Sequence, residues 1–273
     1  GSRAIVLSGG EFGAAQVLTY FASQVDSLTL GVFFGPYVSG LYSRAFQLAG
    51  VPINGVLAPL TQVVVPHVNR ARSETVSAAS ILLRVQRMVC FPVIGVFAVI
   101  FASADGLILL VLGDQWMEAV PFLRWLCIAG AVNVLSYVSF WAFIVENRSR
   151  ALLQYNLVSK PIGITCVLIG ATFGPIGVAA GYAVGLMISW PLNLLWLKRV
   201  ADYSFAGYIR GGMSLLLAAG FAATAGWYMS AWMNSPLLAA ATALLVFTAV
   251  SLASTVGREA MKDYRRFGLR GES

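Results

Sequence analysis

The sequence contains few charged residues. Only 11% of its 273 residues are Asp, Glu, Lys or Arg, whereas soluble domains carry roughly 25%. Hydrophobic residues make up 59% of the chain, so the composition excludes an ordinary soluble domain and indicates a membrane protein. The net charge of +7 does not indicate nucleic-acid binding, because the basic residues flank apolar runs and form no basic face interleaved with aromatic residues.

The side chains that usually build catalytic or metal sites are also scarce. The single histidine is His67, and the chain has no Walker-type loop and no H-E-x-x-H motif. The three cysteines, Cys90, Cys127 and Cys166, are far apart within apolar runs, where they are typical of small buried residues. We therefore expect no enzyme activity, no cofactor and no metal site. The first residues, GSRAIVLSGG, do not have the form of a signal peptide.

The apolar residues fall into eight runs, each long enough to cross a bilayer core of ~30 Å as a helix. Short segments rich in Gly or Pro separate several of them, at Gly35-Pro36, Gly174-Pro175 and Asn234-Ser235-Pro236. The sequence thus predicts an all-α polytopic membrane protein with about eight transmembrane helices, at 12–34, 39–66, 82–104, 118–145, 151–173, 175–197, 209–229 and 236–256.

The basic residues indicate the orientation of these helices. Fifteen of the eighteen Lys and Arg residues fall at one side of the predicted membrane, and the opposite links carry only Asp105 and Asp114. Because basic loops stay in the cytoplasm, both ends of this chain are expected there. The segment 107–121, with Trp116, is expected to be an interfacial bend, and the basic tail 258–273 to contact anionic lipid.

Three charged residues lie inside the predicted spans. Asp26, Arg44 and Arg124 would all be roughly 8–12 Å from the outer face at 1.5 Å per helical residue. One interpretation is a structural ion pair between Asp26 and Arg44 across the first hairpin. The other is a polar cavity with surplus positive charge, suited to an anionic substrate. Lys160, deeper in the fifth span, either reaches the interface or faces a cavity.

Uncharged polar residues add candidates for a substrate path. Gln24 continues a stripe formed with Gln16 and Tyr20, and the remaining candidates are Gln47, Asn133 and Tyr137. Each of these could equally make a hydrogen bond between helices. In the second span, Pro52, Pro59 and Pro66 predict repeated kinks, which either shape packing or serve alternating access.

Three stretches together resemble one protein family. The first has an Asp in a helix (Asp26), a Gly35-Pro36 turn and then the helix start GLYSRA at 40–45. The second is VLGDQWMEAVPFLRWLCIAGA at 111–131, and the third is GPIGVAAGYAVG at 174–185. In this order they are similar to the C-terminal portion of bacterial polysaccharide and O-antigen flippases of the multidrug/oligosaccharidyl-lipid/polysaccharide (MOP) exporter superfamily.

The resemblance implies an architecture. Residues 1–200 would be the C-terminal six-helix lobe of a transporter, 201–257 two additional peripheral helices and 258–273 a cytoplasmic tail. The N-terminal lobe of such a transporter would lie outside this chain. Half of the substrate cavity would then be contributed by residues that this sequence does not contain.

The resemblance also implies a function. Such a protein would move an undecaprenyl-diphosphate-linked oligosaccharide across the bacterial inner membrane, for exopolysaccharide, capsule or O-antigen synthesis, in contact with membrane lipids and with polymerase or assembly proteins. Arg44, Arg124 and Lys160 would meet the anionic group, and Asp26 would gate the path or carry a coupling proton. The alternatives are a multidrug or lipid II exporter of the same superfamily, or a membrane scaffold for polysaccharide assembly that does not itself transport.

Overall fold

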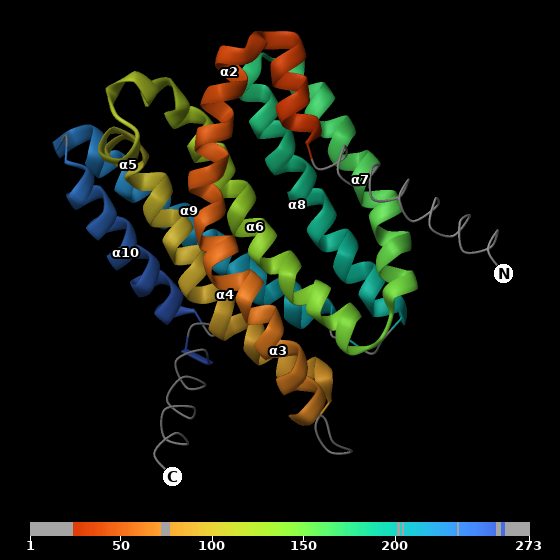
Figure 1. Cartoon of the computed structure of the whole chain (residues 1–273). Helices are drawn as coiled ribbons and strands as arrows, with labels where there is room; N and C mark the ends of the chain where they lie inside the picture. The colour runs from red at the N-terminus through yellow and green to blue at the C-terminus, as the bar shows by residue number, and fades with distance from the viewer. Residues whose placement is uncertain are drawn as a thin grey trace, which may run out of the picture.

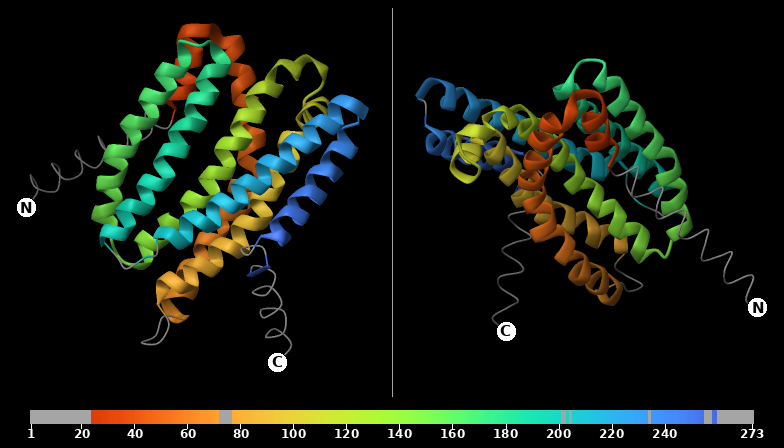
Figure 2. Two further views of the ribbon diagram at one scale, coloured as in Figure 1. Left: turned by 180° about the vertical axis from the view of Figure 1, so that it is seen from behind. Right: turned by 45° about the horizontal axis from the view of Figure 1, so that its top comes forward.

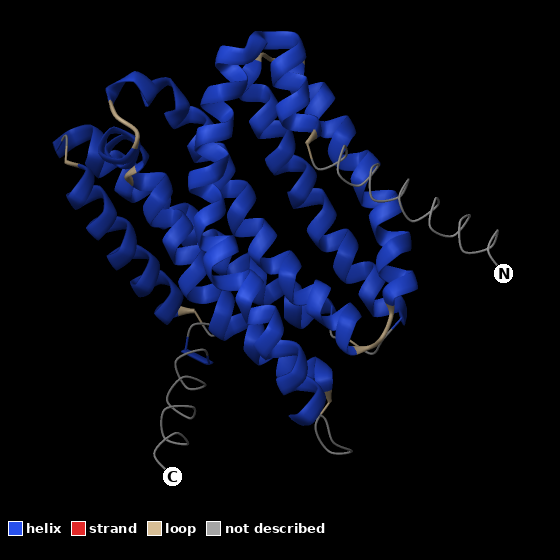
Figure 3. Cartoon of the chain, viewed as in Figure 1, coloured by secondary structure: helices blue, strands red, loops and turns tan. Residues whose placement is uncertain are grey.

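The computed structural model describes residues 24–71, 77–200, 203, 205–233, 235–254 and 258–259. Over these residues the chain is helical and contains no strand (Figure 3). Seven of the described helical runs are long and apolar enough to cross a membrane. The prediction of an all-α polytopic membrane protein is confirmed. The first predicted span is described only from Gln24 onward, and its residues 12–23 lie outside the described part.

The first described element, α2 (Val25–Pro52), is two antiparallel segments joined at Gly35. Gly35 has φ +89°, which residues other than glycine rarely adopt, and Pro36 then starts the second segment. The Ser39 hydroxyl donates a hydrogen bond to the Ser27 carbonyl oxygen at 3.3 Å, across this hairpin. The predicted turn at Gly35-Pro36 is present, at the red end of the chain in Figure 1.

The second segment of α2 continues into a π-turn, η1 (Ile53–Leu57), and then into α3 (Ala58–Ala71). Pro52 lies just before the π-turn and Pro59 just after it. A proline removes a backbone donor and crowds the preceding turn, so a locally wider turn accommodates both residues. The predicted irregularity is thus concentrated between Pro52 and Pro59. The indole nitrogen of Trp141 donates to the Thr61 hydroxyl at 2.9 Å and joins α3 to α6.

The third and fourth predicted spans are α4 (Ala78–Ala102) and α6 (Val120–Val145). Between them lie a short helix, α5 (Ala104–Val111), and a 3-10 turn, η2 (Asp114–Ala119). Gly113, with φ +94°, separates these two elements. The predicted bend at 107–121 is therefore an α5–turn–η2 connection.

The remaining four predicted spans are two further helical hairpins. Helices α7 (Ser149–Ala171) and α8 (Pro175–Val200) are joined by the turn at Gly174, and α9 (Phe205–Met233) is followed by α10 (Pro236–Ala253). Helices α7 and α8 pack very closely. A Cβ atom added at Gly181 would lie only 2.2 Å from the carbonyl oxygen of Cys166. Two helix backbones approach this closely only where the contact residues are small, and Gly181 is such a residue.

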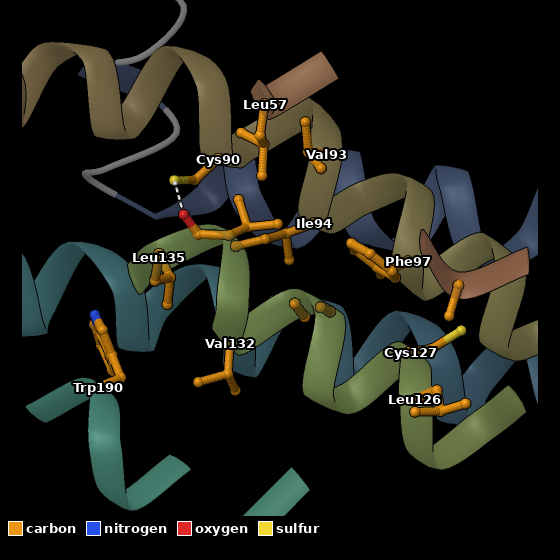
Figure 4. Packing of buried hydrophobic residues seen from close by; sticks show 14 of the residues in the cluster. Leu57, Cys90, Val93, Ile94, Phe97, Leu126, Cys127, Val132, Leu135 and Trp190 are labelled. Carbon is orange, nitrogen blue, oxygen red and sulfur yellow. Dashed lines mark hydrogen bonds between the residues drawn. The ribbon is translucent and has the colours of Figure 1, made fainter. Parts of the chain in front are cut away.

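Helix α6 runs through the middle of the bundle and contacts α2, α4, α7 and α8 (Figure 1). Helices α9 and α10 pack on α4, on the far side of α6 from α7 (Figure 2). Figure 4 shows buried apolar side chains where α4 packs on α6, among them Ile94 and Phe97 on α4 and Cys127 and Leu135 on α6. The bundle therefore has an apolar side built on α4 and a second side built on α7 and α8.

Candidate functional site

A cavity of about 350 Å³ lies between α6, α7 and α8, with the start of α2 at its edge. Aliphatic and aromatic residues line it together with many polar side chains, although it lies within helices long enough to span a membrane. Buried polar groups in lipid are costly unless they have partners or face water. The polar lining consists of Asp26, Asn133, Ser136, Tyr137, Tyr155, Asn156, Ser159, Lys160, Tyr182, Ser189 and Asn193.

Lys160 is the cationic residue of this lining. Lys160 therefore lines the cavity, and the residue is also exposed. Within the described part of the chain, no carboxylate lies within ion-pair distance of its ammonium group. Helix α7 carries Asn156 one turn before Lys160, so both side chains project from the same face of the helix. An unpaired cation here can attract an anionic group.

Asp26 lies at the edge of the same cavity and is only 4% exposed. One carboxylate oxygen accepts a hydrogen bond from the hydroxyl of Tyr42, and the other accepts one from the Ser27 backbone N–H at 2.9 Å. Tyr42 is itself fully buried. An acidic residue inside an apolar helix needs a polar partner. For Asp26 this partner is Tyr42, on the second segment of the hairpin.

The predicted ion pair between Asp26 and Arg44 is wrong for the described residues. Arg44 is exposed, donates to the Gln47 side chain at 3.2 Å and stacks over the Trp116 ring at 5.5 Å. The physical reason is helix geometry: Arg44 follows Tyr42 by two residues, which places it about 200° further around the helix. Since Tyr42 faces Asp26, Arg44 must face away.

Arg124 also has a different environment from the one expected. It pairs with Asp105 at 2.5 Å and lies 6.0 Å from the Phe101 ring centroid, so it ties α5 and α4 to α6. Neither Arg44 nor Arg124 is among the residues lining the 350 Å³ cavity. The three charges that share a depth along the helices thus do not converge on one cavity.

Of the uncharged residues predicted to line a substrate path, some line the cavity and some do not. Asn133 and Tyr137, at i and i+4 on α6, both line the cavity. With Tyr182 they also line a neighbouring cavity of about 210 Å³. This second space extends to Asn54 in the π-turn. Gln24 and Gln47 are exposed and contribute to neither cavity.

Several lining residues were not predicted from the sequence. Tyr155 and Ser159 on α7, and Ser189 and Asn193 on α8, are buried polar residues of the cavity wall. Each pair is spaced by four residues, so each forms a stripe on one helix face. That spacing inside the fifth and sixth apolar runs is a signal that could have found them. No His, Cys, Asp or Glu cluster suited to a metal occurs among the described residues.

Comparison with known proteins identifies a matching family and several similar proteins. Residues 3–121 match a family described as polysaccharide biosynthesis protein. The chain is 24% identical over 202 residues to the lipopolysaccharide biosynthesis protein WzxC of Escherichia coli, covering 72% of this chain and 40% of that protein. It is 23% identical over 211 residues to the teichuronic acid biosynthesis protein TuaB of Bacillus subtilis, covering 76% of this chain and 44% of TuaB.

A membrane protein encoded in the cps region of Klebsiella pneumoniae is 24% identical over 198 residues, which cover 71% of this chain and 40% of that protein. No solved structure matches. The chain spans less than half the length of these curated relatives. The resemblance seen in the sequence motifs is confirmed: the chain is a multi-pass membrane protein similar to polysaccharide biosynthesis proteins.

Proposed function

We propose that this chain is the C-terminal part of a flippase that moves a lipid-linked oligosaccharide across the bacterial inner membrane. The observation that carries the proposal is Lys160, a cation without a carboxylate partner in the described residues, on the wall of a cavity with several polar groups between helices long enough to span a membrane. The names of WzxC and TuaB support a role in polysaccharide biosynthesis. An undecaprenyl-diphosphate group would supply the anionic partner for Lys160.

In this proposal the cavity residues have separate roles. Lys160 attracts the diphosphate, while Asn133 and Tyr137 bind the cargo where the two cavities meet. Asp26, held by Tyr42, gates the path or carries a coupling proton. Arg124 is held by Asp105, and Arg44 lies on an exposed face, where it meets cargo only if a further part of the transporter encloses that face.

The wider arrangement follows from the same proposal. Residues 1–200 form a six-helix lobe, 201–257 two additional peripheral helices and 258–273 a basic tail. Both ends of the chain face the cytoplasm, and the protein itself has no enzymatic activity. Polymerase and other assembly proteins act on the cargo after it has crossed.

A complementation experiment tests the proposal. In a strain that lacks the gene, the full-length wild-type gene should restore surface polysaccharide and Lys160→Gln should not, whereas Lys160→Arg should retain most of the activity because it keeps the charge. Lys198→Gln, at the end of α8 and outside the cavity, is the matched control and should complement normally. Normal polysaccharide with Lys160→Gln would remove the proposal's main support.

A further inference from the structure

A group of buried polar side chains lies between α7 and α8, near the end of the bundle where α7 begins and α8 ends. Its members are Tyr155, Ser159, Ser189 and Asn193, which are between 3% and 8% exposed and line the 350 Å³ cavity. The Tyr155 hydroxyl donates to the Ser189 carbonyl oxygen at 3.1 Å, and Ser159 and Asn193 lie within hydrogen-bonding reach of that hydroxyl. We refer to these four residues as the α7–α8 polar group.

Contacts between helices leave Asn193 incompletely satisfied. Its side-chain oxygen, Oδ1, is buried and has no hydrogen-bond partner among the described residues, and the residue is only 3% exposed. Buried polar atoms in native proteins nearly always have a partner, because an unmet acceptor loses its hydration without compensation. Asn193 is one of the residues that line the cavity, so a ligand bound there that donates an O–H or N–H group would satisfy this oxygen if the side chain turns toward it.

The chemistry around this acceptor is uncharged. The group offers hydroxyls, an amide and a phenol ring, and Asn156 adds a second amide on the same wall. The charged residues of the cavity are Lys160, which follows Ser159, and Asp26, whose two oxygens already accept hydrogen bonds from protein groups. Neutral donors and acceptors next to aromatic rings suit a sugar ring, which has hydroxyls at its edge and C–H groups on its faces.

We propose that the α7–α8 polar group binds an uncharged pyranose ring of the cargo, with Asn193 Oδ1 accepting a hydrogen bond from a sugar hydroxyl or an acetamido N–H. This inference rests on the proposed function. Lys160 lies next along α7, farther from the end where the helix begins, so the bound ring is the one attached to the diphosphate that Lys160 attracts. A sugar without the correctly placed donor leaves Oδ1 unpaired, which makes Asn193 a residue that determines specificity.

Sugar binding to the full-length protein in lipid nanodiscs tests the inference. The probes are methyl β-D-glucopyranoside, methyl β-D-galactopyranoside and N-acetylglucosamine, followed by saturation-transfer NMR. At least one probe should bind the wild-type protein, and Asn193→Leu should weaken it about five- to tenfold, the effect of one lost hydrogen bond in a buried site. Ser159→Ala, a milder change in the same group, should weaken it about two- to fivefold and carries the test if Asn193→Leu does not fold.

Gln86→Leu is the matched control. Gln86 is 1% exposed and also has an unpartnered amide oxygen, but it lies on α4 and is not among the cavity residues. Sugar binding should be unchanged in this variant. Equal weakening by Gln86→Leu and Asn193→Leu, unchanged binding in both Asn193→Leu and Ser159→Ala, or no binding of any probe by the wild type would overturn the inference. If export still depends on Lys160, such a result overturns the sugar subsite and leaves the proposed function standing.

Discussion

The hydroxyl of Tyr42 donates a hydrogen bond to the carboxylate of Asp26, across the hairpin that turns at Gly35. Both residues are buried, and Asp26 is at the edge of the cavity that also contains Lys160. The contact fixes the orientation of the one acid on the cavity wall. It also joins the two segments of α2, so a change at Asp26 can be transmitted to the helix that continues into the π-turn.

Removing the Tyr42 hydroxyl should therefore destabilise the protein. Tyr42→Phe keeps the ring that packs edge-on against Phe122 but leaves a buried carboxylate oxygen without its donor, at a cost of about 1–3 kcal/mol. Thermal unfolding in detergent should show a lower midpoint. Tyr182→Phe is the control, because the Tyr182 hydroxyl makes no hydrogen bond in the described residues and its ring lines the same cavity. Equal midpoints for the two variants would contradict the assigned contact.

The ion pair between Arg124 and Asp105 joins α6 to α5, and we expect its role to be structural. Arg124→Gln and Asp105→Asn are each expected to lower stability slightly, and a double-mutant cycle should give a coupling of about 1 kcal/mol or less, because Asp105 is 42% exposed. Exchanging the two residues should restore part of the loss. Reduced export by Arg124→Gln at unchanged stability would instead indicate a direct contact with cargo.

Close packing of α7 on α8 makes Gly181 intolerant of a larger side chain. Gly181→Ala would bring a Cβ atom to 2.2 Å from the Cys166 carbonyl oxygen, so the helices must separate, at a cost of about 1–3 kcal/mol. Gly220→Ala on α9 meets nothing within 4 Å and should leave stability unchanged or raise it by up to about 1 kcal/mol. Midpoints of thermal unfolding for both variants check this, and a Gly181→Ala protein as stable as the wild type would refute the packing.

Much of the fold was predictable from the sequence. The turns at glycines, the irregular helix near prolines and the lengths of the apolar runs are all determined by nearby residues. Gly35 and Gly174 adopt positive φ values at the predicted turns, and Pro52 and Pro59 flank the irregular part of the second predicted span. Element ends differed by a few residues, as with α9, which begins at Phe205 rather than at 209. Such ends depend on capping and on neighbouring helices, which apolar length does not record.

The candidate site was less predictable, because depth along a helix says nothing about direction around it. Arg44 and Asp26 share a depth, yet Tyr42 is the residue that faces Asp26. Asn133 and Tyr137 were found because their i and i+4 spacing records direction, and both line the cavity. Asn193 was missed although Ser189 precedes it by four residues, since the sixth span carries few charges to draw attention to it.

A reconstituted flipping assay tests whether Lys160 draws an anionic lipid-linked sugar into the cavity. Full-length protein in proteoliposomes would receive a fluorescent undecaprenyl-diphosphate-linked oligosaccharide, and a membrane-impermeant quencher would report its movement between leaflets. We expect flipping by the wild type, a loss of about tenfold or more with Lys160→Gln and near-normal rates with Lys160→Arg and Lys198→Gln. Flipping by Lys160→Gln at the wild-type rate, or none by the folded wild type, would contradict it.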